Sequence, residues 1–167
     1  MTYMATLIEL CEAGALERLD PQLPNKWQEL RLVYLMPRAL RWLADILPEL
    51  EGIWDDEISP AEQFQAHVEL WARGEPLVYS WQFKPLVHLA DGIWEWKTRD
   101  LRAFGWFPQK DVFVCAAIDD ATKIKEHDLY RGYCSQSAAD RDHLSLDEPK
   151  FIPGEKPEDV VSNFSYP

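Results

Sequence analysis

Cysteine is scarce in this sequence, which has only Cys11, Cys115 and Cys134 among its 167 residues. An odd number of widely spaced cysteines argues against a disulfide framework or a zinc cluster, and it is typical of a reducing compartment. Long hydrophobic runs are also missing, since the longest falls far short of the roughly 20 apolar residues that cross a bilayer. Residues 1–10 carry Glu9 and no basic group, so a secretory signal is not expected. We therefore expect a cytoplasmic protein that does not engage a membrane.

Basic residues are the next shortage, because 17 Lys and Arg stand against 29 Asp and Glu, for a net charge of −12. The imbalance is uneven: 6 basic and 14 acidic residues lie in 1–80, 7 and 7 in 81–126, and 4 and 8 in 127–167. Such a molecule repels a free polyanion, so any nucleic-acid role has to use the neutral middle segment. The cations considered there are Lys97, Arg99, Arg102, Lys110, Lys123 and Lys125. An alternative is that they are solvated partners of neighbouring acids.

The first 50 residues predict two helices and one strand. Residues 5–19 carry apolar side chains at helical spacing. Residues 30–36, LRLVYLM, are short and apolar with β-formers at the centre, which favours a strand. Pro37 then suits the first turn of a helix over residues 38–47. The alternative is one helix over residues 26–50 that is kinked at Pro37.

A third helix has clear start and stop signals. Ser59 can cap it, Pro60 suits its first position, and Glu62 completes a capping-box pattern. We predict that it ends near Arg73, before Gly74. The preceding residues 51–58 predict an acidic loop. Its run of two aspartates and a glutamate at 55–57 could bind a divalent cation, but an acidic loop alone is usually solvated, so we predict no metal site.

From residue 77 the pattern changes to short strands, predicted at residues 86–89, 92–97, 103–107 and 112–118. Strands joined by short turns are antiparallel, because a parallel link needs a long crossover. Residues 126–144 have helical character, and 147–167 carry four prolines and few apolar anchors. The sequence therefore predicts an α+β fold in which helices pack on one side of a small antiparallel sheet. Its parts are an N-terminal helical extension (1–28), a main domain (29–146) and an extended C-terminal tail (147–167).

The most informative stretch is residues 91–107, DGIWEWKTRDLRAFGWF. Alternation along two strands joined by a short connection brings Lys97 and Arg102 together near one hairpin end. Two cations with tryptophans nearby can hold a phosphate and stack a base. The alternative is a structural ion pair between Glu95 and an arginine, with the tryptophans in the core.

The run IWEWKTRDLRAFGWF, followed by DVFVCAAIDDATKIKEHDLYRGY, resembles the RelE/ParE toxin superfamily, most closely its HigB-like, phage-derived branch. The resemblance covers about residues 30–144, including the preceding strand and two helices. It implies a RelE-like fold and, for many members, cleavage of messenger RNA on the ribosome and inhibition by an antitoxin. It implies an endoribonuclease that needs no metal or other cofactor, in which the 2′-hydroxyl attacks the adjacent phosphate.

The resemblance assigns roles to seven residues. Arg102 and Lys97 are the candidates for stabilising charge on the phosphate, and His127 is a candidate for proton transfer. Arg99, Lys123, Lys125 and Tyr130 are the candidates for substrate binding, with Tyr130 also near enough in sequence to stack a base or move a proton.

Two departures from the family pattern support a second function. Asp119 and Asp120 stand where the family usually has paired lysines, and the chain is acidic where the toxins are commonly basic. A non-catalytic binding or inhibitor protein that reuses the fold to engage a basic protein partner is therefore the alternative. A related hypothesis is that the acidic residues 1–28 cover the basic face in place of an antitoxin.

Overall fold

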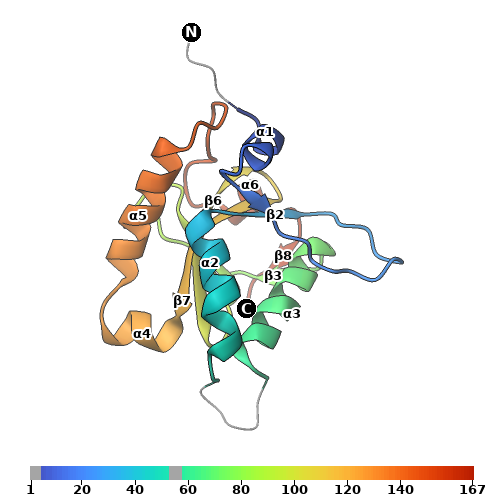
Figure 1. Ribbon diagram of the computed structural model, residues 1–167, viewed down its shortest axis with the longest axis vertical. Coiled ribbons are helices and arrows are strands. Elements are labelled where there is room, and N and C mark those ends of the chain that lie inside the picture. The colour runs from blue at the N-terminus through green and yellow to red at the C-terminus, as the bar shows by residue number, and fades with distance from the viewer. Residues whose placement is uncertain (1–4, 53–57) are drawn as a thin grey trace.

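A six-stranded sheet with the strand order β1-β2-β7-β6-β5-β4 runs through the centre of the protein. The computed structural model describes residues 5–52 and 58–167 (Figure 1). The central strands are β1 (Glu17–Arg18), β2 (Leu32–Leu35), β4 (Phe83–Pro85), β5 (Trp94–Lys97), β6 (Leu101–Gln109) and β7 (Val112–Asp120). A second, two-stranded sheet pairs β3 (Leu77–Val78) in parallel with β8 (Phe164–Ser165).

The helices are α1 (Leu7–Glu12), α2 (Pro37–Asp45), α3 (Pro60–Ala72), α4 (Ala121–Glu126), α5 (Tyr130–His143) and α6 (Pro157–Val160), with a 3-10 turn at Leu47–Glu49. The predicted start of α3 is confirmed, since the Ser59 side chain accepts a hydrogen bond from the Glu62 N–H and Pro60 is the first helical residue. A strand followed by a helix that begins at Pro37 is also confirmed, in place of one kinked helix. The α+β class is therefore as predicted.

The prediction of a purely antiparallel sheet is wrong, because β2 pairs in parallel with β7. The strands from β4 to β7 form the antiparallel meander that their short connections require. However, β2 lies before α2 and α3 in the chain, and the long connection that contains these helices lets β2 pair in parallel with β7. The rule for short connections holds for the meander and does not apply to β2.

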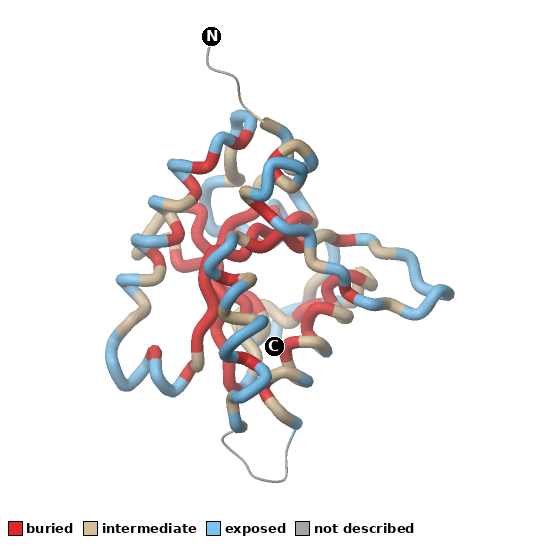
Figure 2. The backbone as a smooth tube through the Cα atoms, viewed as in Figure 1, coloured by how far each residue is buried: buried red, intermediate tan, exposed pale blue. Residues whose placement is uncertain are grey.

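Helices cover both faces of the sheet, so the prediction of helices on one side is also wrong. One hydrophobic cluster packs α2, α3 and α6 on one face, while another packs α1, α4 and α5 on the opposite face. The reason lies in β6 and β7, which are buried at nearly every position instead of at alternate ones. Such strands need cover on both faces. Figure 2 shows these buried strands between more exposed helices.

The predicted strand at residues 86–89 is wrong, since those residues form a turn and the chain pairs earlier, at β4. The predicted helix over residues 5–19 is shorter, because α1 ends at Glu12 and Gly14 takes a φ of 79°. The chain then adds β1 to the central sheet. The C-terminal tail is not wholly extended either, since it contains α6 and β8.

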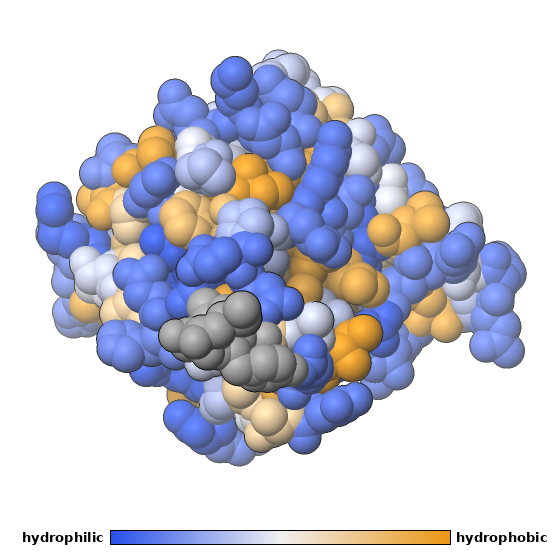
Figure 3. All heavy atoms as spheres, turned by 90° about the horizontal axis from the view of Figure 1, so that it is seen from above, coloured by the Kyte–Doolittle hydropathy of each residue, from blue (hydrophilic) through white to orange (hydrophobic). Residues whose placement is uncertain are grey.

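The visible surface is mainly hydrophilic. Figure 3 views the end of the molecule near α1 and shows hydrophobic side chains in separate groups among hydrophilic ones. Among residues 5–52 and 58–167, the exposed large hydrophobic residues are Ile8, Trp27, Leu30, Ile46, Ile58, Trp81 and Tyr166. Within the part of the chain that the structure describes, no helix is long and apolar enough to cross a bilayer.

Candidate functional site

The β5–β6 hairpin brings Lys97 and Arg102 together, as predicted, because they are direct cross-strand partners. The connection between them is closed by two hydrogen bonds, from the Leu101 N–H to the Thr98 hydroxyl (3.1 Å) and from the Thr98 N–H to the Leu101 carbonyl (3.1 Å). Opposed residues share one face of a sheet, so two cations lie side by side there.

Arg102 is held firmly, although it is a long side chain. Its Nη1 donates to the carbonyls of Thr98 (2.6 Å) and Leu101 (2.8 Å), and its Nε donates to the Tyr130 hydroxyl at 3.2 Å. Only 6% of the residue is exposed. Among the described residues, none accepts a hydrogen bond from Nη2. This nitrogen is therefore the part of the guanidinium that can meet a ligand.

Glu95 is a member of this site that the sequence analysis treated only as a structural ion-pair partner. It is buried on the same face as Lys97, and its negative charge helps to raise the pKa of the nearby Tyr130 hydroxyl, for which burial is the larger cause. Burial raises the pKa of Glu95, and the positive charges of Arg102 and Lys97 partly oppose that shift. The sequence WEWK indicates this position for Glu95, because strand alternation places Glu95 on the same face as Lys97 and on the face opposite the two tryptophans.

The two tryptophans of β5 are not available to a base at this site. Trp94 and Trp96 face the core beneath α3, and both are almost fully buried. Trp96 stacks against Phe113 with ring centroids 4.4 Å apart. The core interpretation of these tryptophans is the one that the structure supports.

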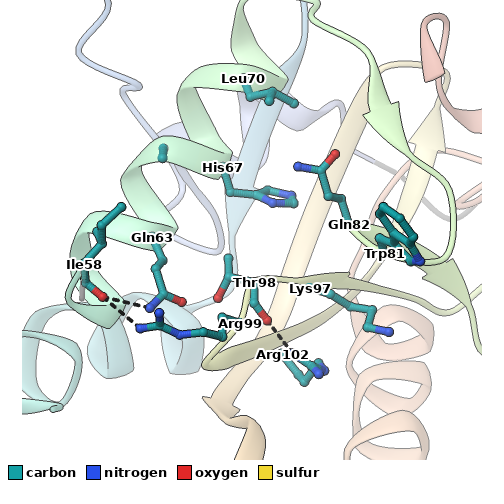
Figure 4. A pocket seen from close by; sticks show the side chains of 11 residues that line it. Ile58, Gln63, His67, Leu70, Trp81, Gln82, Lys97, Thr98, Arg99 and Arg102 are labelled. Carbon is teal, nitrogen blue, oxygen red and sulfur yellow. Dashed lines mark hydrogen bonds between the residues drawn. The ribbon is translucent and has the colours of Figure 1, made fainter. Parts of the chain in front are cut away.

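A cavity of about 560 Å³ opens between α3 and the β5–β6 hairpin, and Lys97, Arg99 and Arg102 line it (Figure 4). Arg99 forms an ion pair with the buried carboxylate of Asp100 (3.1 Å) and donates to the Ile58 carbonyl (3.2 Å). Asp100 also accepts a hydrogen bond from Gln63 of α3 at 2.6 Å. Arg99 therefore helps to tie the hairpin to α3 while it lines the cavity.

His67 is the other group at this cavity that the sequence analysis did not select. It lies on α3, is 5% exposed, and packs against Trp96 with ring centroids 4.8 Å apart. Burial lowers the pKa of His67 to about 4, and nearby Arg31 adds to this effect. No described residue is within hydrogen-bonding distance of its buried Nε2. The ring is therefore neutral near pH 7 and has an unused polar atom.

The other predicted residues divide between two places. Tyr130 contacts Arg102, and the charge of Lys125 is close enough to lower the pKa of Lys97, although burial is the larger cause. In contrast, Lys123 and His127 line a separate hollow beside Asp119 and Trp42. The structure does not bring His127, the predicted proton-transfer residue, into the cavity with Arg102.

Asp119 and Asp120 have structural roles that explain why acids replace the expected lysines. Asp119 is buried, accepts a short hydrogen bond from the Tyr133 hydroxyl, and forms an ion pair with Lys123 at 3.0 Å. The Asp120 side chain caps α4 by accepting from the Lys123 N–H. These two carboxylates are used within the fold.

The predicted acidic cover is not found in the described part of residues 1–28. These residues lie toward the β1 edge of the sheet, and none of them lines the cavity. In the described ranges, no three His, Cys, Asp or Glu side chains form a group that could hold a metal ion. The acidic run at 55–57 lies outside the described residues.

Comparisons with known proteins found no matching family model, curated protein or solved structure.

Proposed function

We propose that this protein is a RelE/HigB-like toxin of a toxin–antitoxin or phage-derived system, and that it cleaves messenger RNA without a metal. The observation that carries the proposal is the pair formed by Lys97 and Arg102 on one sheet face, next to a cavity. Arg102 has a fixed guanidinium whose Nη2 contacts no acceptor within the described part of the chain. A cation held in this way is suited to a phosphate oxygen.

The order of elements also supports the proposal. A strand and two helices precede the antiparallel meander, and α5 follows it. This is the order that accompanies the sequence resemblance over residues 30–144. The residues that carry the resemblance lie on the adjacent strands β5, β6 and β7, and continue through α4 into the start of α5.

The chemistry follows from the phosphate. The 2′-hydroxyl oxygen attacks the adjacent phosphorus, the bond to the 5′-oxygen breaks, and a 2′,3′-cyclic phosphate forms. Lys97 and Arg102 stabilise the negative charge that builds on the phosphate oxygens. One proton moves overall from the 2′-oxygen to the departing 5′-oxygen. The geometry favours Tyr130 with Glu95 for handling this proton over His127, because the Tyr130 hydroxyl contacts Arg102 directly.

An acidic protein that binds a basic partner is the second candidate, and the net charge of −12 favours it. Such a partner would be captured from a bacterial lysate at low salt and released at moderate salt, because exposed charges are then screened. The internal roles of Asp119 and Asp120 make this candidate weaker than the first, since these two acids are committed to the fold.

Induced expression in a bacterial host tests the proposal. We expect the wild-type chain to arrest growth and to produce new messenger RNA ends by primer extension. Arg102→Ala should lower cleavage by about 100-fold or more, which is the usual effect of removing one preorganised donor. Arg41→Ala, an exposed arginine on α2, is the matched control and should behave as wild type. Normal growth and intact messages with a folded wild-type chain would reject the toxin and favour the acidic binding protein.

A further inference from the structure

The cavity beside the hairpin has two chemically different sides. Figure 4 shows the cations along the lower side of the cavity, with Arg99 beside Gln63 and Ile58, Arg102 at the bottom and Lys97 below Trp81, while His67, Leu70, Gln82 and Trp81 lie along the other side. The first side is cationic and the second has no charged side chain among these labelled residues. A ligand that fits both sides has an anionic group joined to a flat, uncharged group that carries polar atoms at its edge.

Trp81 gives the uncharged side an aromatic surface. It is 65% exposed, in contrast to the buried tryptophans of β5. The turn that carries it is fixed, since the Ser80 N–H donates to the Phe83 carbonyl (2.8 Å) and Lys97 Nζ donates to the Ser80 carbonyl (3.0 Å). Ser80 takes a φ of 70°, which is uncommon for a residue other than glycine. The backbone of the turn is therefore held in place, and the exposed indole offers a flat apolar surface on which a flat ligand can stack.

His67 gives the same side a polar atom without a partner. The residue is 5% exposed, and its Nε2 makes no hydrogen bond to any residue that the structure describes. Buried polar groups are usually satisfied, and leaving one without a partner costs stability. A ligand with a hydrogen-bonding edge would satisfy this nitrogen when it entered the cavity.

We propose that this cavity binds one nucleotide of the RNA, with its base stacked on Trp81 and hydrogen-bonded to His67, and its phosphate at Lys97 and Arg102. The inference rests on the proposed function and names how the same site holds its substrate. The volume, about 560 Å³, is within the range of about 300–1,000 Å³ for pockets that enclose small ligands. The bond from Lys97 to Ser80 couples the two sides, because the same ammonium supports the Trp81 turn and faces the phosphate.

Calorimetric titration of the purified full chain tests this arrangement without any need for cleavage. The probes are adenosine 3′-monophosphate, adenosine and inorganic phosphate. We expect the nucleotide to bind at least ten-fold more tightly than adenosine or phosphate alone, because it occupies both sides at once.

Three variants separate the two sides. Trp81→Ala should weaken the nucleotide by about ten-fold or more, the usual effect of losing one base–aromatic stack, and leave phosphate binding unchanged. Arg102→Ala should weaken the nucleotide and phosphate but not adenosine. Trp27→Ala is the matched control, since Trp27 is partly exposed and packs on Arg73 away from the cavity lining. His67→Phe keeps an aromatic ring against Trp96 and should weaken the nucleotide several-fold.

Two binding results would overturn the base site: a nucleotide that binds no more tightly than phosphate, or a Trp81→Ala variant that binds the nucleotide as the wild type does. Cleavage of messenger RNA that needs Arg102 but not Trp81 would also reject the base site while leaving the proposed function intact. Nucleotide binding that needs both Trp81 and Arg102, in a chain that cleaves no RNA, would support the site and reject the endoribonuclease.

Discussion

At the scale of single residues, the candidate site is partly local and partly assembled by packing. Strand alternation predicts that Lys97 and Arg102 are neighbours, and the cross-strand pairing confirms it. His67 and Trp81 could not be found in the same way, because they come from α3 and a separate turn and reach the cavity only in the folded chain. A scattered histidine in a sequence has no spacing that signals burial beside a cationic hairpin.

The burial of His67 predicts a specific loss of stability in acid. Its folded-state pKa, about 4, is below the ordinary value of 6.5, so between these values the unfolded chain binds a proton that the folded chain excludes. Stability should therefore fall as pH falls from 6.5 to 4, by about 2–3 kcal/mol between pH 7 and pH 4.5. Urea unfolding at the two pH values measures this loss.

His67→Phe should remove that component, so the variant loses about 2–3 kcal/mol less than wild type over the same interval. His127→Phe changes an exposed histidine and is the matched control. Equal pH dependence in wild type and His67→Phe would mean that His67 is not excluded from protonation in the folded protein.

At the scale of elements, local signals predict what lies within a helix or hairpin, but not which distant strands pair. Ser59, Pro60 and Gly74 fix α3 because caps and helix ends act over a few residues. The partner of β2 is decided by how the chain returns to the sheet after two helices, and nothing in residues 30–36 encodes it. The near-continuous apolar run of β7 does indicate a strand that is buried on both faces. The prediction of helices on one side of the sheet did not take this run into account.

The register shift in β6 predicts that any side chain at Gly105 lowers the stability of the protein. The register between β6 and β7 shifts at Phe104 and Gly105, and a Cβ at Gly105 would collide with the Val114 carbonyl and lie 2.9 Å from the Phe113 ring. Because backbone on a central strand cannot move aside cheaply, Gly105→Ala should lower the free energy of unfolding by about 2–3 kcal/mol in a urea titration.

Gly132 provides the opposite control on α5. A Cβ there meets nothing within 4 Å, and the residue is exposed in a helix interior. Gly132→Ala should therefore raise the free energy of unfolding by about 1 kcal/mol. A Gly105→Ala variant as stable as Gly132→Ala would contradict the packing of β6 against β7.

At the scale of the whole molecule, an acidic chain can still bind RNA if a few of its cations are grouped at one binding site. The net charge is −12, so long-range attraction is absent and a few short-range contacts have to supply the affinity. In the proposed site, Lys97 and Arg102 would provide two such contacts, and both line the cavity. The net charge of −12 is the reason why composition alone favoured the acidic binding protein.

A site with only two phosphate contacts predicts that RNA affinity depends weakly on salt concentration. With two phosphate contacts, a plot of log affinity against log salt for a short single-stranded RNA should have a slope of about −1.4. Arg102→Ala should reduce the slope by about 0.7, since one contact is lost. Fluorescence anisotropy between low and physiological salt measures both slopes. A steep slope that Arg102→Ala leaves unchanged would mean that RNA binds elsewhere on the molecule.

The most direct test is the chemistry of the RNA ends that the purified chain leaves when it acts on messenger RNA in programmed ribosomes. We expect a 2′,3′-cyclic phosphate on one fragment and a 5′-hydroxyl on the other, with both products lost in Arg102→Ala and kept in Arg41→Ala. Fragments that carry a 5′-phosphate, or a wild-type chain that leaves the message intact under conditions where it is folded, would contradict the proposed function.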